Sequence, residues 1–285
     1  MGTFRNWPPP SDKIFKRTGK PTFKKPKKPK GGGGGGITDP TDLTGLVLWL
    51  DGSDSSTIMR TAGSQPWGAG SVPVTADGQT VEGWLDKSAQ TNHLNQSGAN
   101  SEPTYKTAIQ NGLSVIRSID AAADDYLFST ASILSQDQNV SMFCVAAATG
   151  NETLGAVYSN TNTSRDRITL HVDSRSAIKE GVIVEDTLVE VHAKIPSDIG
   201  TEFNQISGII DGLDAVARLN GVAGTVAVAP GVMTTANDYT RVFNQFSSNT
   251  DFFGDIGELV IYDRTLNNGE INKVEKYLKD KWATP

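Results

Sequence analysis

The stretch GDIGELVIYDRTLNNGEINKVEKYLKDKW, residues 254–282, contains the two kinds of secondary structure that we expect in this chain. Its first part is rich in β-branched and aromatic residues, which predicts a strand. Its second part, Thr265–Trp282, has apolar residues three or four positions apart, which predicts an amphipathic helix with one apolar stripe. The stripe consists of Ile271, Val274, Leu278 and Trp282, with Tyr277 beside it. We predict that this helix closes one end of a β-sandwich.

The ends of this helix carry their own signals. Asn267 or Asn268 is suited to cap its start, and Glu270 lies in the first turn, where a negative charge favours the helix dipole. Lys279 and Lys281 lie in the last turn, where cations are favourable.

Most of the preceding chain is a series of short apolar stretches separated by Gly, Asn, Asp and Ser. We expect strands at LTGLVLWLDGSD, GLSVIRSID, VSMFCVAAA, DRITLHVD, EGVIVEDTLVEVHAKI, NQISGIIDG and AVARLNG. This density of strands and turns is typical of an all-β fold with two antiparallel sheets. The sequence therefore predicts a jelly-roll sandwich over residues 41–285, with one C-terminal amphipathic helix.

The net charge of −6 conceals a strong asymmetry between the N-terminal arm and the remainder of the chain. Residues 1–30 contain ten Lys or Arg and one acidic residue, so they carry +9, and residues 31–285 carry −15. Prolines recur through this arm, which favours an extended, polyproline-like chain. Large apolar residues recur as well, and these favour an arm that docks on a partner rather than an inert tail.

The arm is the predicted attachment site. Charge would steer it onto an acidic surface, and burial of aromatic side chains would then retain it. Nucleic acid is the alternative partner, because lysines neutralise phosphates without reading bases. The predicted binding residues are Phe4, Arg5, Trp7, Phe15, Lys16, Arg17, Phe23, Lys24, Lys25, Lys27, Lys28 and Lys30.

Residues 31–40 form the predicted linker, which begins with the six glycines Gly31 to Gly36. Such a stretch has a root-mean-square reach of about 13 Å. It matches a glycine-rich phosphate-binding motif only trivially, because no strand precedes it and no helix follows it.

Other classes of protein are disfavoured. The longest strongly apolar run, Leu46–Leu50, is far shorter than a bilayer span of roughly 20 residues, so we expect no membrane association. No apolar segment follows the first charged residues, so we expect no Sec signal peptide. The single cysteine, Cys144, lies in an apolar strand and forms no intrachain disulfide.

The sequence lacks the common catalytic motifs, and its three histidines, His93, His171 and His192, are widely separated. Acidic turns offer weak candidates for a calcium site, because carboxylates are preferred Ca²⁺ ligands, yet Asp is also an ordinary turn residue. The candidates are Asp51, Asp54, Asp124 and Asp125. We expect no cofactor and no enzymatic activity.

Four segments resemble the laminin-G-like, concanavalin-A-like jelly-roll domains. They are GLVLWLDGSDSSTI (45–58), VEGWLDKSAQTNHLNQ (81–96), PTYKTAIQNGLSVIRSIDAAADDYL (103–127) and the closing stretch 254–282. The similarity covers residues 45–282, with the closing stretch most specific and residues 150–200 similar only in strand rhythm. One departure is Ser118-Ile119, where the family often has an aromatic residue.

The resemblance implies two antiparallel sheets packed face to face and the binding of glycans, proteins or calcium. Domains of this kind also occur in bacteriophage structural proteins. We therefore expect a non-enzymatic virion protein, made in the host cytoplasm, that decorates a capsid or forms a short head fibre. Its arm would bind the major capsid protein or another virion protein. The alternative is a glycan-binding or host-adhesion module of a tail fibre or cell-surface protein. A glycan ligand on the jelly roll and a homo-oligomer are compatible with both.

Overall fold

The computed structural model describes residues 35–61, 70–96, 102–118, 125–130, 133–134, 139–149, 154–161, 167–173, 180–186, 189–197, 199–212, 214–228, 239–245 and 251–285. The compact unit spans Gly36–Pro285. The predicted arm and most of the predicted linker lie outside the described residues.

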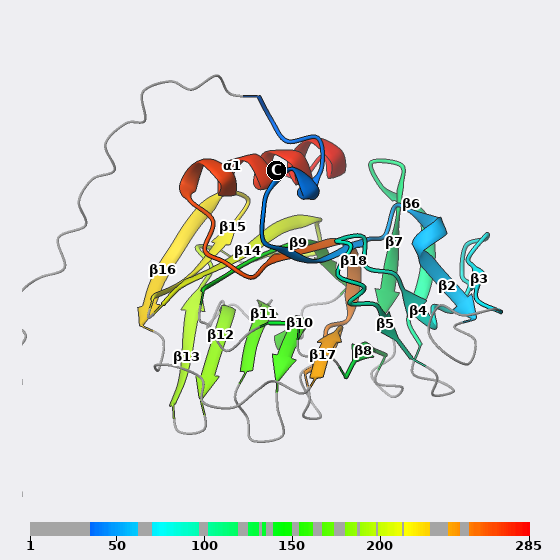
Figure 1. Cartoon of the computed structure of the whole chain (residues 1–285), viewed down its shortest axis with the longest axis horizontal. Coiled ribbons are helices and arrows are strands. Elements are labelled where there is room, and N and C mark those ends of the chain that lie inside the picture. The colour runs from blue at the N-terminus through cyan, green and yellow to red at the C-terminus, as the bar shows by residue number, and fades with distance from the viewer. Residues whose placement is uncertain are drawn as a thin grey trace, which may run out of the picture. The chain divides into compact units, whose positions relative to one another are not determined.

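The chain folds into two antiparallel sheets, which confirms the predicted fold class (Figure 1). Sheet A has eight strands in the order β16-β15-β14-β9-β18-β7-β6, with β1 paired to β18. Its strands are β1 (Leu46–Asp51), β6 (Thr104–Gln110), β7 (Leu113–Ser118), β9 (Asn139–Ala148), β14 (Asn204–Asp211), β15 (Asp214–Leu219), β16 (Val222–Val228) and β18 (Gly254–Tyr262).

Sheet B has ten strands in the order β13-β12-β11-β10-β17-β8-β5-β4-β2-β3. Its strands are β2 (Ile58–Thr61), β3 (Val72–Pro73), β4 (Gly83–Trp84), β5 (Leu94–Asn95), β8 (Leu127–Ser129), β10 (Leu154–Thr161), β11 (Arg167–Asp173), β12 (Glu180–Asp186), β13 (Val189–Lys194) and β17 (Tyr239–Val242). Two 3-10 turns, η1 (Pro40–Asp42) and η2 (Ser55–Thr57), flank β1.

The larger core lies between the sheets. Strand residues alternate between the two faces of a sheet, so every second side chain of β9, β11 and β14 enters this core. Examples are Cys144, Leu170 and Ile206, which are fully buried. Cys144 is thus a buried strand thiol, as expected, and burial raises its pKa.

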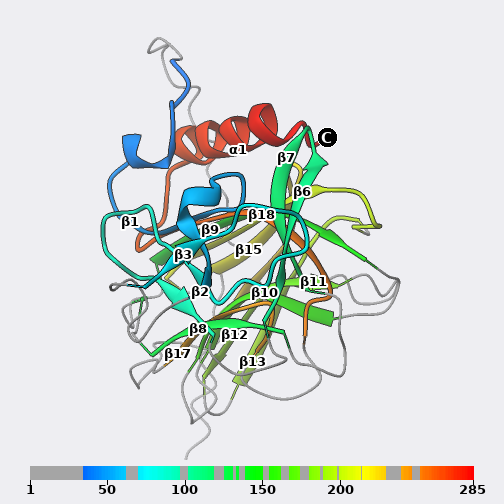
Figure 2. The same ribbon diagram turned by 90° about the vertical axis from the view of Figure 1, so that its right-hand side faces the viewer.

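The C-terminal helix α1 (Asn268–Trp282) covers the outer face of sheet A, as the two perpendicular views show (Figures 1 and 2). The predicted stripe packs there against Phe143 and Val260. Asn267 caps the helix: its side chain accepts from the backbone N–H groups of Gly269 and Glu270, and Glu270 Oε2 accepts from the N–H of Asn267. The predicted helix and its cap are confirmed, although the helix begins three residues later than expected.

The sequence prediction was coarser than the fold in two places. The stretch Glu180–Ile195, given as one strand region, forms the two antiparallel strands β12 and β13. The apolar stretches did not predict the long strands β10 and β16 or the four-residue strands β2 and β17. Their polar residues and their short apolar runs weaken the alternation on which the prediction depends. Among the described residues, no helix is long and apolar enough to span a membrane.

Candidate functional site

A buried carboxylate joins α1 to sheet A. Glu258 of β18 is fully buried and accepts hydrogen bonds at 2.7 Å from the indole N–H groups of Trp49 and Trp282. Tyr277 donates its hydroxyl at 2.8 Å, and Lys281 Nζ lies 2.7 Å from the second carboxylate oxygen. Burial and the neighbouring Asp51 raise the pKa of Glu258. Three of these partners, Tyr277, Lys281 and Trp282, belong to α1, so the hydrogen bonds and ion pair of Glu258 hold the helix on the sheet.

A bulge at Gly257 turns Glu258 toward the helix. The pairing of β18 with β9 shifts register between Ile256 and Glu258, so Ile256 and Leu259 both face the central core. A Cβ atom at Gly257 would lie 2.9 Å from the Trp282 ring, so only glycine allows the indole to pack there. The Gly257-Glu258 pair of the closing stretch therefore has a structural role.

Asp51 and Asp54, the weak calcium candidates in the first acidic turn, form ion pairs with lysines. Asp51 lies 2.9 Å from Lys87 Nζ and 2.8 Å from Lys281 Nζ, and Asp54 lies 2.9 Å from Lys87 Nζ. Burial alone would raise the pKa of Asp51, but Lys281 and hydrogen bonds from Ser53 and Lys87 lower it. Among the described residues, no group of three or more His, Cys, Asp or Glu is placed to bind a metal.

A second turn held by hydrogen bonds contains the residues WLDKS (84–88), which belong to the segment 81–96 that resembles the jelly-roll family. Asp86 accepts from the backbone N–H of Trp49 at 2.9 Å and from the Ser88 hydroxyl at 2.6 Å. His93 Nδ1 accepts from the N–H of Asp86 at 2.9 Å. These residues hold the loop against β1 and leave His93 in a structural position.

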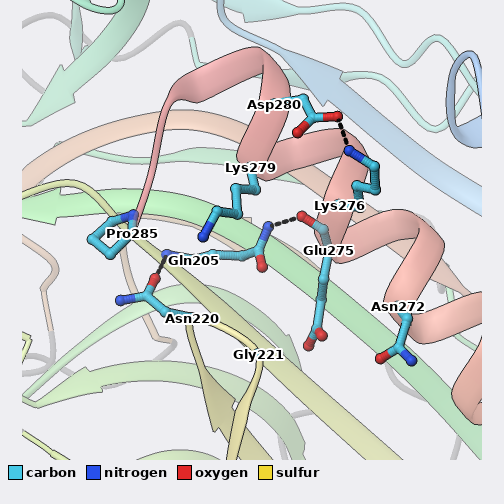
Figure 3. Close-up of a pocket in the computed structure, with 9 residues that line it drawn as sticks. All are labelled: Gln205, Asn220, Gly221, Asn272, Glu275, Lys276, Lys279, Asp280 and Pro285. Carbon is cyan, nitrogen blue, oxygen red and sulfur yellow. Dashed lines mark hydrogen bonds and ion pairs between the residues drawn. The ribbon is translucent and has the colours of Figure 1, made fainter. Parts of the chain in front are cut away.

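A shallow polar groove of about 370 Å³ runs beside α1 (Figure 3). Its lining residues are Gln205, Asn220, Gly221, Asn272, Glu275, Lys276, Lys279, Asp280 and Pro285. Most are tied to one another or to neighbours. Gln205 donates to the Glu275 carbonyl at 2.7 Å, and Lys276 pairs with Asp280 at 2.6 Å. The Glu275 carboxylate is bound by Arg218 at 2.7 Å.

The outer face of sheet B differs in chemistry. On β11, Ile168 and Leu170 enter the core, so Thr169 and His171 point to the opposite side. Ser159 of β10 lies opposite Thr169, and Arg241 of β17 lies opposite Ser159. The Ser159 and Thr169 hydroxyls are buried and find no hydrogen-bond partner among the described residues. A row of polar side chains therefore crosses three adjacent strands.

Aromatic rings adjoin this row around Arg241. The Arg241 guanidinium carbon lies 4.7 Å from the centre of the Tyr126 ring, and Phe128 lies 5.8 Å from that ring, centre to centre. Arg241 also donates to Asn244 at 3.1 Å, and Asn244 donates to Asp251. Tyr126, Phe128 and Arg241 are half-buried. We call Tyr126, Phe128, Arg241, Asn244 and Asp251 the Arg241 cluster.

Within the Arg241 cluster, the positive charge of Arg241 lies near the negative charge of Asp251. Burial lowers the pKa of Arg241, and the nearby Tyr126, Tyr239 and Asp251 oppose that change. Because a planar guanidinium stacks on an aromatic ring and has five N–H donors, it can order the ring and also bind a polar ligand. The cluster thus combines half-buried aromatic rings with fixed hydrogen-bonding groups.

The structure separates the residues that the sequence singled out. Asp125 is buried next to Tyr126, whereas Asp124 and the whole arm lie outside the described residues. His171 and His192 both lie on strands of sheet B, with β12 between them, and His93 lies in the turn at Asp86. The predicted arm residues therefore stay a prediction.

The Arg241 cluster was not predicted from the sequence. Its residues come from three separate segments, 125–130, 239–245 and 251–285, and aromatic residues beside polar ones are common along the chain. Without strand pairing, nothing shows that Phe128 lies opposite Arg241.

No protein-family model matches the sequence, and no curated protein matches it. The structure is similar to the binding domain of Paraclostridial Mosquitocidal Protein 1, with a TM-score of 0.53 and 14% identity over 87% of this chain and 56% of that one. It also aligns, at a TM-score of 0.43 and 13% identity, with domain 4 of AbnA, a GH43 extracellular arabinanase from Geobacillus stearothermophilus solved with arabinotriose. That alignment covers 81% of this chain and 98% of the other.

A further alignment is with the CBM40 of the Ruminococcus gnavus IT-sialidase bound to α2,3 sialyllactose, at a TM-score of 0.40 and 13% identity. It covers 49% of this chain and 84% of that one. The chain is a two-sheet β-sandwich with a helix on one outer face and a polar, aromatic-bearing opposite face. The mosquitocidal binding domain shares this fold.

Proposed function

We propose that this chain is a non-enzymatic glycan-binding adhesion module that binds its ligand on the outer face of sheet B. The observation that carries the proposal is the Arg241 cluster, in which half-buried Tyr126 and Phe128 adjoin a guanidinium and an amide. The apolar face of a sugar ring packs on an aromatic ring, and its hydroxyls need hydrogen-bond donors and acceptors. Ligand sites commonly combine these two kinds of group.

The alternative surface, the groove beside α1, supports this assignment less well. Among its lining residues, only Pro285 has a ring, and Gln205, Lys276 and Asp280 already pair with other groups of the protein. The fold also favours a binding role, because the mosquitocidal protein that shares it contributes a binding domain. Fold alone does not assign function, so the side chains of the cluster carry the argument.

The proposed setting of the module is the surface of a virion. Residues 1–30, with net charge +9 and several aromatic residues, would attach it to a capsid or other virion protein, and Gly31–Gly36 would let the sandwich turn toward its ligand. Capsid decoration without a glycan ligand is the second candidate function, and the sequence of this arm is what favours it.

A glycan array probed with the full chain tests the proposal. The glycan that binds best is then titrated by calorimetry against wild type and Tyr126→Ala. Because Tyr126 supplies aromatic contact and orders Arg241, its loss should weaken affinity about tenfold or more.

Lys279→Ala is the matched control, because Lys279 lines the groove beside α1 on the other side of the sandwich. It should leave affinity unchanged. If Lys279→Ala weakens binding and Tyr126→Ala does not, the ligand occupies the groove. If no glycan binds, the adhesion proposal is wrong and decoration becomes the better proposal.

Attachment is tested separately. Deleting residues 1–30 should give a folded domain that no longer co-sediments with the virion. Trp7→Ala combined with Phe15→Ala should weaken attachment even at low salt, where lysine charges act most strongly. Assembly of the truncated chain at wild-type copy number would show that the sandwich makes the contact. Complete loss of wild-type attachment at moderate salt would point to nucleic acid.

A further inference from the structure

Arg241 is the cation that lies against the aromatic rings of the proposed glycan site, and its N–H groups are largely engaged. Its Nη1 group donates to Asn244 at 3.1 Å, and its Nε atom is buried. Arginine binds a carboxylate most strongly through two parallel hydrogen bonds, which come either from Nε and one Nη group or from both Nη groups. Each of these pairs includes a group that is buried or already donates. Arg241 is therefore poorly placed to hold an anion in the bidentate manner.

A buried carboxylate also offsets the charge of Arg241. Asp251 is 6% exposed and accepts from the amide of Asn244, whose oxygen accepts from Arg241. Asp251 is close enough to oppose the lowering of the Arg241 pKa by burial. An anionic ligand at the guanidinium would therefore also approach this carboxylate, and like charges repel strongly in a partly buried site.

A further guanidinium on the outer face of sheet B is paired as well. Arg167 of β11 precedes the core residue Ile168, so it points outward, and it lies opposite Thr161 of β10 and Glu185 of β12. Its Nε atom lies 2.6 Å from Glu185, and the two side chains are only 15% and 13% exposed. Both guanidinium groups thus have a carboxylate nearby. Residues 31–285 as a whole carry −15, which adds a field that repels anions.

The site offers a ligand aromatic surface and single polar contacts instead. Tyr126 and Phe128 are half-buried, with ring centres 5.8 Å apart and planes inclined at 49°. Tyr239 is also half-buried, and it lies two residues before Arg241 on β17, hence on the same side of the sheet. Aromatic rings pack against the C–H faces of sugars, and sugar hydroxyls need only single donors or acceptors. None of these contacts requires a charge on the ligand.

We propose that the ligand of the Arg241 cluster is a neutral glycan, and that the site discriminates against sugars that carry a carboxylate or sulfate. This inference rests on the proposed function and narrows its class of ligand. Asp251 is the residue that sets the specificity, because its negative charge repels an anion that Arg241 alone would attract.

A glycan array in which each neutral oligosaccharide is printed beside its carboxylated or sulfated counterpart tests the inference with the full chain. The signals that Tyr126→Ala removes should come from the neutral members and exceed those of their acidic counterparts about tenfold or more. Calorimetric affinity for the best neutral member should change less than about twofold between about 50 and about 500 mM NaCl, because salt screens only charged contacts. Acidic ligands that depend on Tyr126 would overturn the inference and leave the adhesion proposal standing. If no glycan binds, both are wrong.

Asp251→Asn tests the cause of the selectivity. Asparagine keeps an oxygen that can accept from Asn244 but removes the charge, so acidic counterparts should bind about threefold to tenfold more tightly, with neutral glycans unaffected. Asp280→Asn is the matched control, because it removes the same charge from the surface of α1, where Asp280 pairs with Lys276, and it should leave the selectivity unchanged.

Thermal melting shows whether both variants remain folded. Unchanged selectivity in a folded Asp251→Asn chain would overturn the role of Asp251. An equal gain in Asp280→Asn would overturn it too, because net charge alone would then explain the effect. The array decides the class of ligand even if Asp251→Asn fails to fold.

Discussion

The two outer faces of this sandwich are built from the same strand alternation but differ in their contents. On sheet A the outward residues are apolar, such as Phe143 and Val260, and helix α1 covers them. On sheet B the outward residues include Ser159, Thr169 and Arg241, with Tyr126 and Phe128 half-buried beside them. A face that packs against the protein's own helix needs apolar contact, whereas a face that binds a polar ligand needs fixed polar groups and accessible rings.

This contrast shows where stability and recognition lie in the molecule. The outer face of sheet A buries three carboxylates, Asp51, Glu258 and Glu275, and each of them is bound by side chains of the protein itself. In the Arg241 cluster, by contrast, Tyr126, Phe128 and Arg241 are only half-buried, beside the buried Asn244 and Asp251. We therefore expect substitutions beneath α1 to act on folding and substitutions at the Arg241 cluster to act on binding.

The largest effect is expected from Leu278→Asp, which removes the cover of sheet A. Leu278 is fully buried in the apolar cluster beneath α1, so the change opens a cavity and buries an unpaired charge. The free energy of unfolding should fall by more than about 4 kcal/mol in urea titrations. Lys279→Asp, on the exposed side of the helix, should change it by less than about 1 kcal/mol. Equal melting of both variants would mean that the helix does not pack on the sheet.

The next effect concerns Glu258, the fully buried carboxylate of this face. Glu258→Ala leaves two indole N–H groups, the Tyr277 hydroxyl and Lys281 without this acceptor, and it should cost about 3–5 kcal/mol. Glu258→Gln keeps one acceptor oxygen and removes the charge, so it should cost less than the alanine change. Urea denaturation of both variants provides the comparison. If alanine is tolerated as well as glutamine, the cluster does not anchor the helix.

Acid should weaken the covered face through Asp51. Its pKa lies below the ordinary 3.8, so its ionised form stabilises the fold above about pH 4, and this contribution is lost as pH falls through the folded-state pKa. Glu258 acts in the opposite direction: its raised pKa means that acidification favours its folded, protonated form. Urea midpoints measured against pH should fall less steeply below pH 4 for Asp51→Asn than for wild type. Identical slopes would show that the lysine contacts of Asp51 contribute nothing.

The smallest effect compares the two sides of sheet B itself. Thr240 faces the core and donates to Asn160 at 3.0 Å, whereas the equally buried Thr169 hydroxyl, on the outer side, finds no partner among the described residues. Thr240→Val should therefore cost about 1 kcal/mol, and Thr169→Val should be neutral within about 0.5 kcal/mol or slightly stabilising. Thermal melts measure both changes. A larger loss for Thr169→Val would show that its hydroxyl is satisfied in solution, for example by an ordered water.

The sequence predicted the fold class and the helix well, and the candidate site hardly at all. The closing strand and the helix after it have clear periods, and Asn267 and Glu270 form a local capping box. At the proposed site, the sequence singled out only the neighbouring Asp125, and it predicted a calcium ligand there rather than a glycan contact. Its main functional expectation, the attachment arm, concerns residues that the structure does not describe.

The sequence by itself determined that this chain is a β-sandwich closed by an amphipathic helix. Strand alternation, helical spacing and helix caps all involve residues that are close together in the chain, so they can be recognised without the structure. Tertiary structure alone decided which residues meet. Trp49 contacts Glu258 across 209 positions, and Arg241 reaches Tyr126 only because β17 pairs with β8. Strand order and register bring such residues together, and the single bulge at Gly257 decides which face Glu258 occupies. These are long-range properties, which the spacing of neighbouring residues does not encode.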